Sequence, residues 1–378
     1  MPTMLTATEV DESKNFKLQD VRNAGAKVQG RVRKCFTLIC LLTLTWSCGP
    51  RCDGQAKIHG KFNQDKITVN GSGDFMELQD QKLTFLDSRQ VKWVAPKGTL
   101  TDGASIPGLL VPITGDRFSS EYLKAAVVHD AYCQEENKTR TPDQYRKRTW
   151  KEVHRMFYEG ILAGCTNEVL AKTMYAGILL AGPRWNDPDR ENQGMSEENL
   201  TRGFIGAKQW IEKNKNATVE QMEADVERRE RVLRRLNKFD IDISNAMRGP
   251  DRAHAEGLLR RQEDLLKSEL EKSPDDSMLL NFKGDLHKNW AKVYGMSNRT
   301  SEVNAELISS ERMYEAALKI EPKDPSALSG LGGVAILRGD LSRAENYSRR
   351  ALEIAPSLHG AKRDLEKVRE LRGGGLHQ

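Results

Sequence analysis

A short pattern near the C-terminus returns after 34 residues and constrains the fold more than any other feature of this chain. The segment Ala317–Pro322 (ALKIEP) is followed 34 residues later by Ala351–Pro356 (ALEIAP). This period is the length of one antiparallel helix pair with its turns, and each proline marks the end of one unit. Small, aliphatic and aromatic residues fill the helical positions between the two copies: Ala327, Leu328, Leu331, Ala335, Ala344 and Tyr347. The pattern predicts stacked helix pairs over about residues 273–371.

The repeats need neighbours, because fewer than three units rarely form a stable stack. A degenerate earlier copy ends at Pro274 and requires an insertion near Met296–Val303. Charged helices are predicted at 219–238 and around 258–270, and either these helices or residues 357–371, as a cap, are expected to complete the stack. The array is similar to tetratricopeptide repeats, which implies a surface that binds a protein or peptide partner. A short spacer or a dimerisation arm is the alternative.

Charge and cysteine spacing exclude two classes of protein. Charged residues make up 30% of the 378 residues, yet the net charge is only +5, because Lys and Arg alternate with Asp and Glu in the second half. That pattern is typical of solvated helix faces and argues against a nucleic-acid partner, which needs a concentrated basic patch. The six cysteines show no paired CxxC spacing, so a zinc finger is excluded.

The N-terminal region predicts export. Basic residues at 31–34 precede a twelve-residue apolar run, 35–46, which is shorter than the ~20 residues that span a bilayer. A basic stretch, a short apolar core and small residues are typical of a secretory signal, with Gly54-Gln55-Ala56 as a cleavage site. Cys48 offers a second interpretation, a lipidated cysteine that would anchor the protein in the membrane. The alternative is a buried helix of a cytosolic protein.

An α+β domain is predicted over residues 57–190. Alternating runs at 66–69, 75–78, 83–86 and 91–94 are separated by turn formers and predict a small antiparallel sheet. About three helices follow. The first is capped by Ser119 or Ser120 and runs to about Cys133, and the third runs from about Asn167 to Leu180.

The second helix is predicted to start at Thr141-Pro142-Asp143, where Thr141 is a good cap. Its stripe Asp143, Trp150, His154, Phe157 and Ile161 lies on one face, and Gly164 ends it. In an oxidising compartment Cys133 and Cys165 are expected to form a disulfide. In a reducing compartment they would be buried thiols.

Two motifs in this domain carry a resemblance. The run 91–107 contains Thr-Asp-Gly-Ala-Ser-Ile-Pro at 101–107, and the run 125–132 contains His129-Asp130. Together they resemble a phage and bacterial family known as domain of unknown function 1353, over about residues 60–187. The resemblance implies an α+β fold and no established activity. The family usually has Asp at the position of His154, so either one ligand type has replaced another here or this position is unimportant.

These motifs supply the candidate site. Two histidines and one carboxylate, here His129, His154 and Asp102, form a typical open site for zinc or another divalent metal, with water as the fourth ligand. Asp130 is then placed to orient His129 or to act as a general base.

Ser105 is the remaining catalytic candidate of the motif, although it lacks the Gly-x-Ser-x-Gly elbow of serine hydrolases. The competing interpretation is structural: a core histidine at 129, and a turn stabilised by Asp102.

The sequence thus predicts four parts: a leader at 1–56, an α+β domain at 57–190, a charged helical linker at 191–272 and helical repeats at 273–378. The functional hypothesis is a metal-dependent hydrolase of the periplasm or cell envelope, acting on a peptide or amide and coupled to a partner-binding module. The alternative hypothesis is a non-catalytic envelope scaffold that acts through its repeats.

Overall fold

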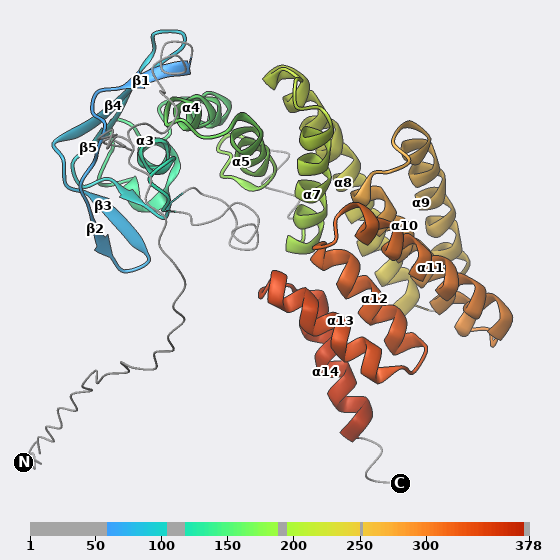
Figure 1. The fold of residues 1–378 in the computed structure, drawn as a ribbon. Coiled ribbons are helices and arrows are strands. Elements are labelled where there is room, and N and C mark those ends of the chain that lie inside the picture. The colour runs from blue at the N-terminus through green and yellow to red at the C-terminus, as the bar shows by residue number, and fades with distance from the viewer. Residues whose placement is uncertain (1–58, 104–117, 188–194, 250–251, 374–378) are drawn as a thin grey trace, which may run out of the picture. The chain divides into compact units, whose positions relative to one another are not determined.

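The computed structural model describes residues 59–103, 118–187, 195–249 and 252–373 (Figure 1). The apolar run 35–46, Cys48 and Ser105 lie outside these residues. Within them, no helix is both long and apolar enough to cross a membrane.

Within the described residues, six strands form two three-stranded antiparallel sheets. The first has the order β1-β4-β5, from Gly60–Phe62, Lys82–Asp87 and Lys92–Pro96. The second has the order β2-β3-β6, from Val69–Ser72, Phe75–Leu78 and Leu100–Thr101. The prediction of a small antiparallel arrangement is confirmed, although the single sheet is in fact two.

One predicted strand is shifted along the chain. Strand β2 begins at Val69, where the predicted strand 66–69 ends. The reason is the position of the turn: Ser72 pairs with Phe75, and Gly73 between them has a φ of +64°. Because only glycine adopts such angles without strain, the hairpin closes at Gly73 and the preceding residues extend. The strand predictions at 75–78, 83–86 and 91–94 are confirmed.

The first sheet buries alternate side chains of β4 and β5 against two helices. Leu83, Phe85 and Trp93 are inaccessible to solvent, as period-two alternation requires for a sheet with one covered face. Helix α3 (Leu123–Cys133) packs against β4, β5 and β6, and α4 (Trp150–Ala163) packs against β1, β4 and α3. Helix α5 (Glu168–Ala181) then packs on α4.

Two predicted helix starts are wrong. Helix α3 begins at Leu123 after Tyr122, without a side-chain cap, so neither Ser119 nor Ser120 caps it. Helix α4 begins at Trp150, and Thr149 forms a capping box with Glu152.

The Thr141 hydroxyl donates instead to the carbonyl oxygens of Ala131 and Asn137, which ties this segment to the end of α3. Asp143 is therefore an exposed turn residue outside the α4 stripe. The predicted Gly164 stop and Asn167 start are confirmed.

Eight helices make up the rest of the described chain. They are α7 (Glu197–Lys213), α8 (Val219–Arg248), α9 (Arg252–Lys272), α10 (Ser277–Gly295), α11 (Thr300–Ile320), α12 (Pro325–Leu337), α13 (Leu341–Ile354) and α14 (His359–Gly373). Each packs against the next in the chain, and α10 also contacts α7 and α12. This is the connectivity of stacked helix pairs that the 34-residue period predicts.

Helices α7 to α9 share an apolar core with their neighbours on both sides. Leu233 and Leu236 of α8 are buried in the same cluster as Ile178 of α5 and Phe282 of α10. The helix predicted at 219–238 is one continuous helix that extends to Arg248. Helices α7 to α9 therefore pack against the described parts of the chain on both sides.

The expected Cys133–Cys165 disulfide is wrong. Cys133 is a free, buried cysteine, whereas Cys165 is disulfide-bonded. Cys133 lies in the last turn of α3, inside the core, and its Sγ is 3.3 Å from Nδ1 of His129.

Candidate metal centre

The candidate centre begins with a helix that is buried on all sides. Every residue of α3 from Ala125 to Cys133 is buried, including His129 and Asp130, which have no accessible surface. Sheet residues cover one side of this helix and α4 covers another. A polar pair in this position must find its hydrogen-bonding partners within the protein, because an unpaired buried polar group costs on the order of 1–3 kcal/mol.

The two histidines of the predicted site face each other through their ring nitrogens. His129 Nε2 lies 3.0 Å from Nδ1 of His154, and both side chains are fully buried. His154 projects from α4 one turn after Trp150, on the stripe that the sequence predicts. The α3–α4 packing therefore joins residues that are 25 positions apart.

Asp130 holds His129 from the opposite side of the imidazole. Its Oδ1 lies 3.0 Å from Nδ1 of His129, and the Thr101 hydroxyl donates to Oδ2 at 2.6 Å. A carboxylate only accepts, so Nδ1 of His129 carries the proton. The lone pair of His129 then lies on Nε2 and points at His154. A carboxylate that orients a histidine in this way is the usual outer partner of a metal-binding imidazole.

Asn137 fixes the strand and the helix that carry these groups. Its Nδ2 donates to the carbonyl oxygens of Leu100 (2.7 Å) and Asp130 (2.8 Å), and its Oδ1 accepts from the Leu100 amide (2.9 Å). Because Leu100 precedes Thr101 in β6, this one buried amide sets the distance between the Thr101 hydroxyl and Asp130.

Aromatic rings and one glycine enclose the histidine pair. The centroid of His129 is 5.0 Å from that of Phe157, and His154 is 5.6 Å from Trp150 and 6.4 Å from Trp185. A Cβ on Gly182 would meet the Ile178 carbonyl oxygen at 2.5 Å and Nε2 of His154 at 3.3 Å. Only glycine lets the chain pass this close to His154.

Cys133 offers a second ligand set. The donor atoms of His129, Asp130 and Cys133 lie within 4.8 Å of one another, and Cys133 Sγ is 3.3 Å from Nδ1 of His129. However, burial raises the pKa of the Cys133 thiol well above its usual value, and the charges of Asp130 and Asp102 raise it further. Without an ion the thiol is therefore protonated, and a metal would have to displace this proton to bind Sγ.

Of the other predicted site residues, the structure describes Asp102. Asp102 follows β6 directly and is partly buried, close enough for its charge to act on Cys133. Thr101 and Cys133 are site residues that the sequence interpretation missed. Two sequence signals could have identified them: Thr101 lies in the same motif as Asp102, and Cys133 follows His129 at the i, i+4 spacing of a helix.

Comparison with known proteins covers this domain. Residues 77–178 match the family model described as protein of unknown function DUF1353, which confirms that part of the predicted resemblance. The uncharacterized protein y4iH of Sinorhizobium fredii (strain NBRC 101917 / NGR234) is 41% identical over 131 residues, or 32% of this chain and 51% of that protein. The uncharacterized protein y4jT of the same organism is 38% identical over 121 residues, 30% of this chain and 33% of that protein.

A shorter match is to the cellulose synthase 2 operon protein C of Komagataeibacter xylinus, 37% identical over 70 residues, 18% of this chain and 5% of that protein. The chain thus spans about half or less of the length of each of these relatives. No solved structure matches the chain. The segment that matches the DUF1353 model, residues 77–178, contains His129, Asp130 and His154, so the candidate centre lies in the part of the chain that is similar to a family whose description states no function.

Proposed function

We propose that the α+β domain is a metal-dependent hydrolase whose ion is bound by His129, His154 and Asp102. The observation that carries this proposal is the 3.0 Å separation between Nε2 of His129 and Nδ1 of His154. Two imidazole nitrogens on one tetrahedral zinc ion, with bonds of ~2.0–2.1 Å, lie about 3.3 Å apart. The pair therefore needs only a small adjustment to receive an ion, and Asp130 already holds His129 in the required tautomer.

The donor set favours zinc. Two imidazoles and a carboxylate suit zinc better than magnesium or calcium, which prefer oxygen ligands alone. Three protein ligands leave one position for water, and zinc lowers the pKa of a bound water to about 7. Asp130 is the residue that orients His129, and Ser105 stays a prediction outside the described residues.

The first test is the metal content of the purified protein beside an Asp130→Asn variant. We expect about one equivalent of zinc in the parent, and zinc affinity weakened ~10- to 100-fold in the variant, because outer-sphere partners of histidine ligands contribute that much. Zinc titration of the apoprotein measures both. Asp143→Asn removes the same charge from an exposed turn residue and should bind zinc like the parent. A parent protein that takes up no added metal refutes the proposal.

The proposed substrate and location of the protein rest on the hypothesis that the chain is exported. The basic stretch and apolar run at 31–46 support delivery to the periplasm or cell envelope, where a peptide or amide of the envelope is the substrate. Lipidation of Cys48 would add a membrane anchor. The disulfide at Cys165 agrees with this location, since disulfides persist in oxidising compartments.

The helical repeats support a second candidate function, a non-catalytic scaffold. A cavity of about 700 Å³ is lined by side chains of α7, α8, α10, α12 and α14. On its wall Arg202 pairs with Asp285 at 2.6 Å, and Lys288 pairs with the same carboxylate at 2.7 Å. Lys292 lies beside them, and its pKa is lowered to about 8 by burial and by the charge of Lys288. A tetratricopeptide-like array with such a polar groove is suited to binding a protein or peptide.

Site-specific crosslinking distinguishes the scaffold from a spacer. A photoreactive residue at Asn289, which lines the groove, should yield a discrete adduct with an envelope protein. The same residue at Lys319, exposed on α11 and outside the groove lining, should not. Identical crosslinking from both positions would contradict a groove-specific partner.

A further inference from the structure

Cys165 has a disulfide partner that lies outside the described residues. Cys165 is disulfide-bonded, whereas Cys133 is a free, buried thiol. The other four of the six cysteines all precede residue 59, where the described structure begins: Cys35, Cys40, Cys48 and Cys52. By elimination, the partner of Cys165 within this chain is one of these four.

Cys165 occupies a backbone position that helices usually give to glycine. It follows Gly164 at the end of α4 and has a φ of +71°. The Cys165 amide donates to the Leu162 carbonyl oxygen at 3.0 Å, and the Thr166 amide donates to that of Ile161 at 3.4 Å. This pair of bonds closes a helix around a left-handed residue, where a side chain is strained. The disulfide accounts for a side chain at this position.

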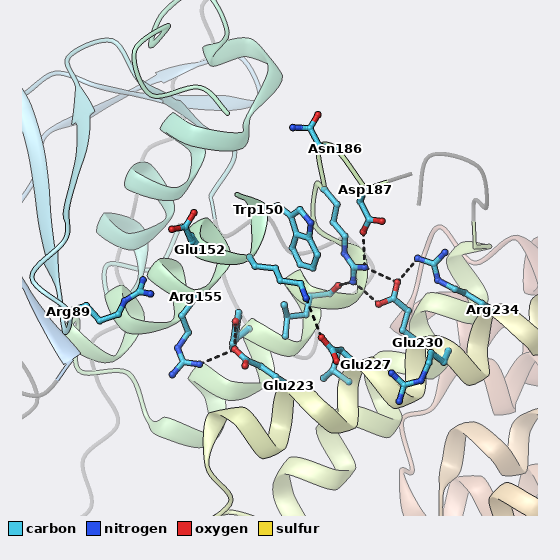
Figure 2. A pocket seen from close by; sticks show the side chains of 16 residues that line it. Arg89, Trp150, Glu152, Arg155, Asn186, Asp187, Glu223, Glu227, Glu230 and Arg234 are labelled. Carbon is cyan, nitrogen blue, oxygen red and sulfur yellow. Dashed lines mark hydrogen bonds and ion pairs between the residues drawn. The ribbon is translucent and has the colours of Figure 1, made fainter. Parts of the chain in front are cut away.

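The turn that carries Cys165 is held firmly by its neighbours. A Cβ on Gly164 would clash with the Glu121 carbonyl oxygen, so the end of α4 lies directly against the chain that leads into α3. Earlier in α4, Arg155 pairs with Glu223 of α8 at 3.0 Å, as Figure 2 shows. A segment bonded to this turn is therefore attached to the packed body of the protein.

The first described residues pass close to the same turn. Burial lowers the pKa of His59, and the charges of Glu159 and Glu168 oppose this shift, so the imidazole lies near both carboxylates. These two glutamates flank Cys165 along the chain, one on α4 and one at the start of α5. Strand β1, which follows His59 directly, packs against α4. The chain thus enters the described structure beside the α4–α5 turn.

Cys52 is the nearest of the four cysteines to this point of entry. It precedes His59 by seven positions, and seven extended residues span roughly 23–25 Å. The helical path from Glu159 to Cys165 rises only about 9 Å. Cys52 is also the one cysteine of the four that falls within the compact unit of residues 50–378. Its thiol can therefore reach Cys165 without any change in the described structure.

We propose that Cys52 is the disulfide partner of Cys165 and that the exported chain retains residue 52. The two thiols lose two protons and two electrons to a disulfide oxidant, which is reduced to two thiols as the new S–S bond forms. Cleavage after Gly54-Gln55-Ala56 would remove Cys52 together with the leader, so the leader is cut before residue 52. The bond then fastens the start of the mature chain to the α4–α5 turn. The export of the chain rests on the proposed function.

Tryptic mapping tests this proposal, because trypsin separates the possible partners into different peptides. Peptide 52–57 contains Cys52, peptide 35–51 contains the other three cysteines, and peptide 156–172 contains Cys165. Full-length protein that is reduced and then reoxidised with oxidised glutathione should yield 52–57 joined to 156–172, and dithiothreitol should release both. Protein isolated from the envelope of an exporting bacterial host should contain the same linked pair without reoxidation.

Two serine variants are the matched controls. Cys48→Ser should keep the linked pair, whereas Cys52→Ser should leave Cys165 free to react with iodoacetamide after denaturation. Cys133 serves as an internal control, since this free cysteine should be found unlinked in peptide 125–138 of every sample.

Three results would overturn the pairing: peptide 156–172 joined to 35–51, joined to a second copy of itself, or unlinked in the reoxidised parent. An exported chain that begins at Lys57 would reject the retention of Cys52 alone. If the chain is not exported, the location given under the proposed function fails, and the reoxidised protein still decides the pairing. None of these results depends on zinc uptake, so failure of this proposal and failure of the metal centre are distinguishable.

Discussion

Replacing Gly330 with alanine is expected to destabilise the protein by about 2 kcal/mol or more, although alanine is the better helix former. Gly330 lies within α12, and a Cβ there would meet the Cε1 and Cζ atoms of Tyr314 at distances of 2.3 Å. Such overpacking typically costs ~1–3 kcal/mol, occasionally more. The gain in helix propensity, about 1 kcal/mol, offsets only part of it.

The ring of Tyr314 has no room to move aside. Gly284 of α10 faces the same ring, with a hypothetical Cβ at 2.6 Å. The Tyr314 hydroxyl donates to Oδ1 of Asp285 at 2.7 Å and accepts from Lys288 at 3.2 Å. The fully buried ring of α11 is thus held where α10 and α12 come together, and displacing it would also strip hydrogen bonds from a buried carboxylate.

Gly257 provides the matched control. It lies within α9, where a Cβ would meet nothing within 4 Å. Gly257→Ala should therefore stabilise the protein by up to ~1 kcal/mol, so the two substitutions have opposite signs. Denaturant unfolding of both variants, followed by circular dichroism, measures the difference. Equal stabilisation by both would mean that Tyr314 is not inserted between the two glycines.

The helical half of this fold was the easier half to predict. Pro322 and Pro356 follow the ends of α11 and α13, and the 34-residue period gave the helix pair at 325–354. In such a stack each helix contacts mainly its neighbours in the chain, so local periodicity carries most of the information. The insertion of Tyr314 was not predictable, because it depends on two glycines that lie 46 residues apart.

The helix starts were harder, because two threonines compete as caps. Thr141 precedes a proline and fits the N-cap pattern as well as Thr149 does. The Thr141 hydroxyl donates to a backbone carbonyl near the end of α3, a contact that the local sequence does not reveal. Of the two threonines, only Thr149 has a glutamate three residues later, which completes the capping box. That glutamate, Glu152, is the signal that identifies the true start.

The candidate site was predictable in its residue types and in the convergence of the two histidines, and not in its hydrogen bonds to the strands. Helical spacing placed His129 and His154 on inward faces, and the α3–α4 packing brings them together. Asp130 contacts His129 as the sequence suggests, although a residue about 100° away on the same helix normally points elsewhere. It turns toward His129 because Thr101, on a strand 29 residues earlier, holds its second oxygen.

Loss of both histidines should abolish metal binding completely, the largest functional effect expected for this protein. The His129→Ala/His154→Ala variant removes two of three proposed ligands, so zinc should fall from about one equivalent to none by plasma mass spectrometry. Both side chains are fully buried, so the variant must also unfold cooperatively. The single variant His154→Gln keeps most of the side-chain volume and should likewise lose tight binding if the double variant fails to fold.

Cys133→Ser decides which ligand set is the correct one. In the proposed centre Nε2 of His129 and His154 would hold the ion, whereas Cys133 Sγ lies nearer to Nδ1 of His129 (3.3 Å) than to Nε2 (3.7 Å). The serine variant should therefore keep its zinc. In the alternative set, with His129, Asp130 and Cys133 as ligands, the serine variant would lose the ion while His154→Gln retained it. The two variants thus give opposite results for the two geometries, and loss of zinc in Cys133→Ser alone would move the centre to the other side of the His129 ring.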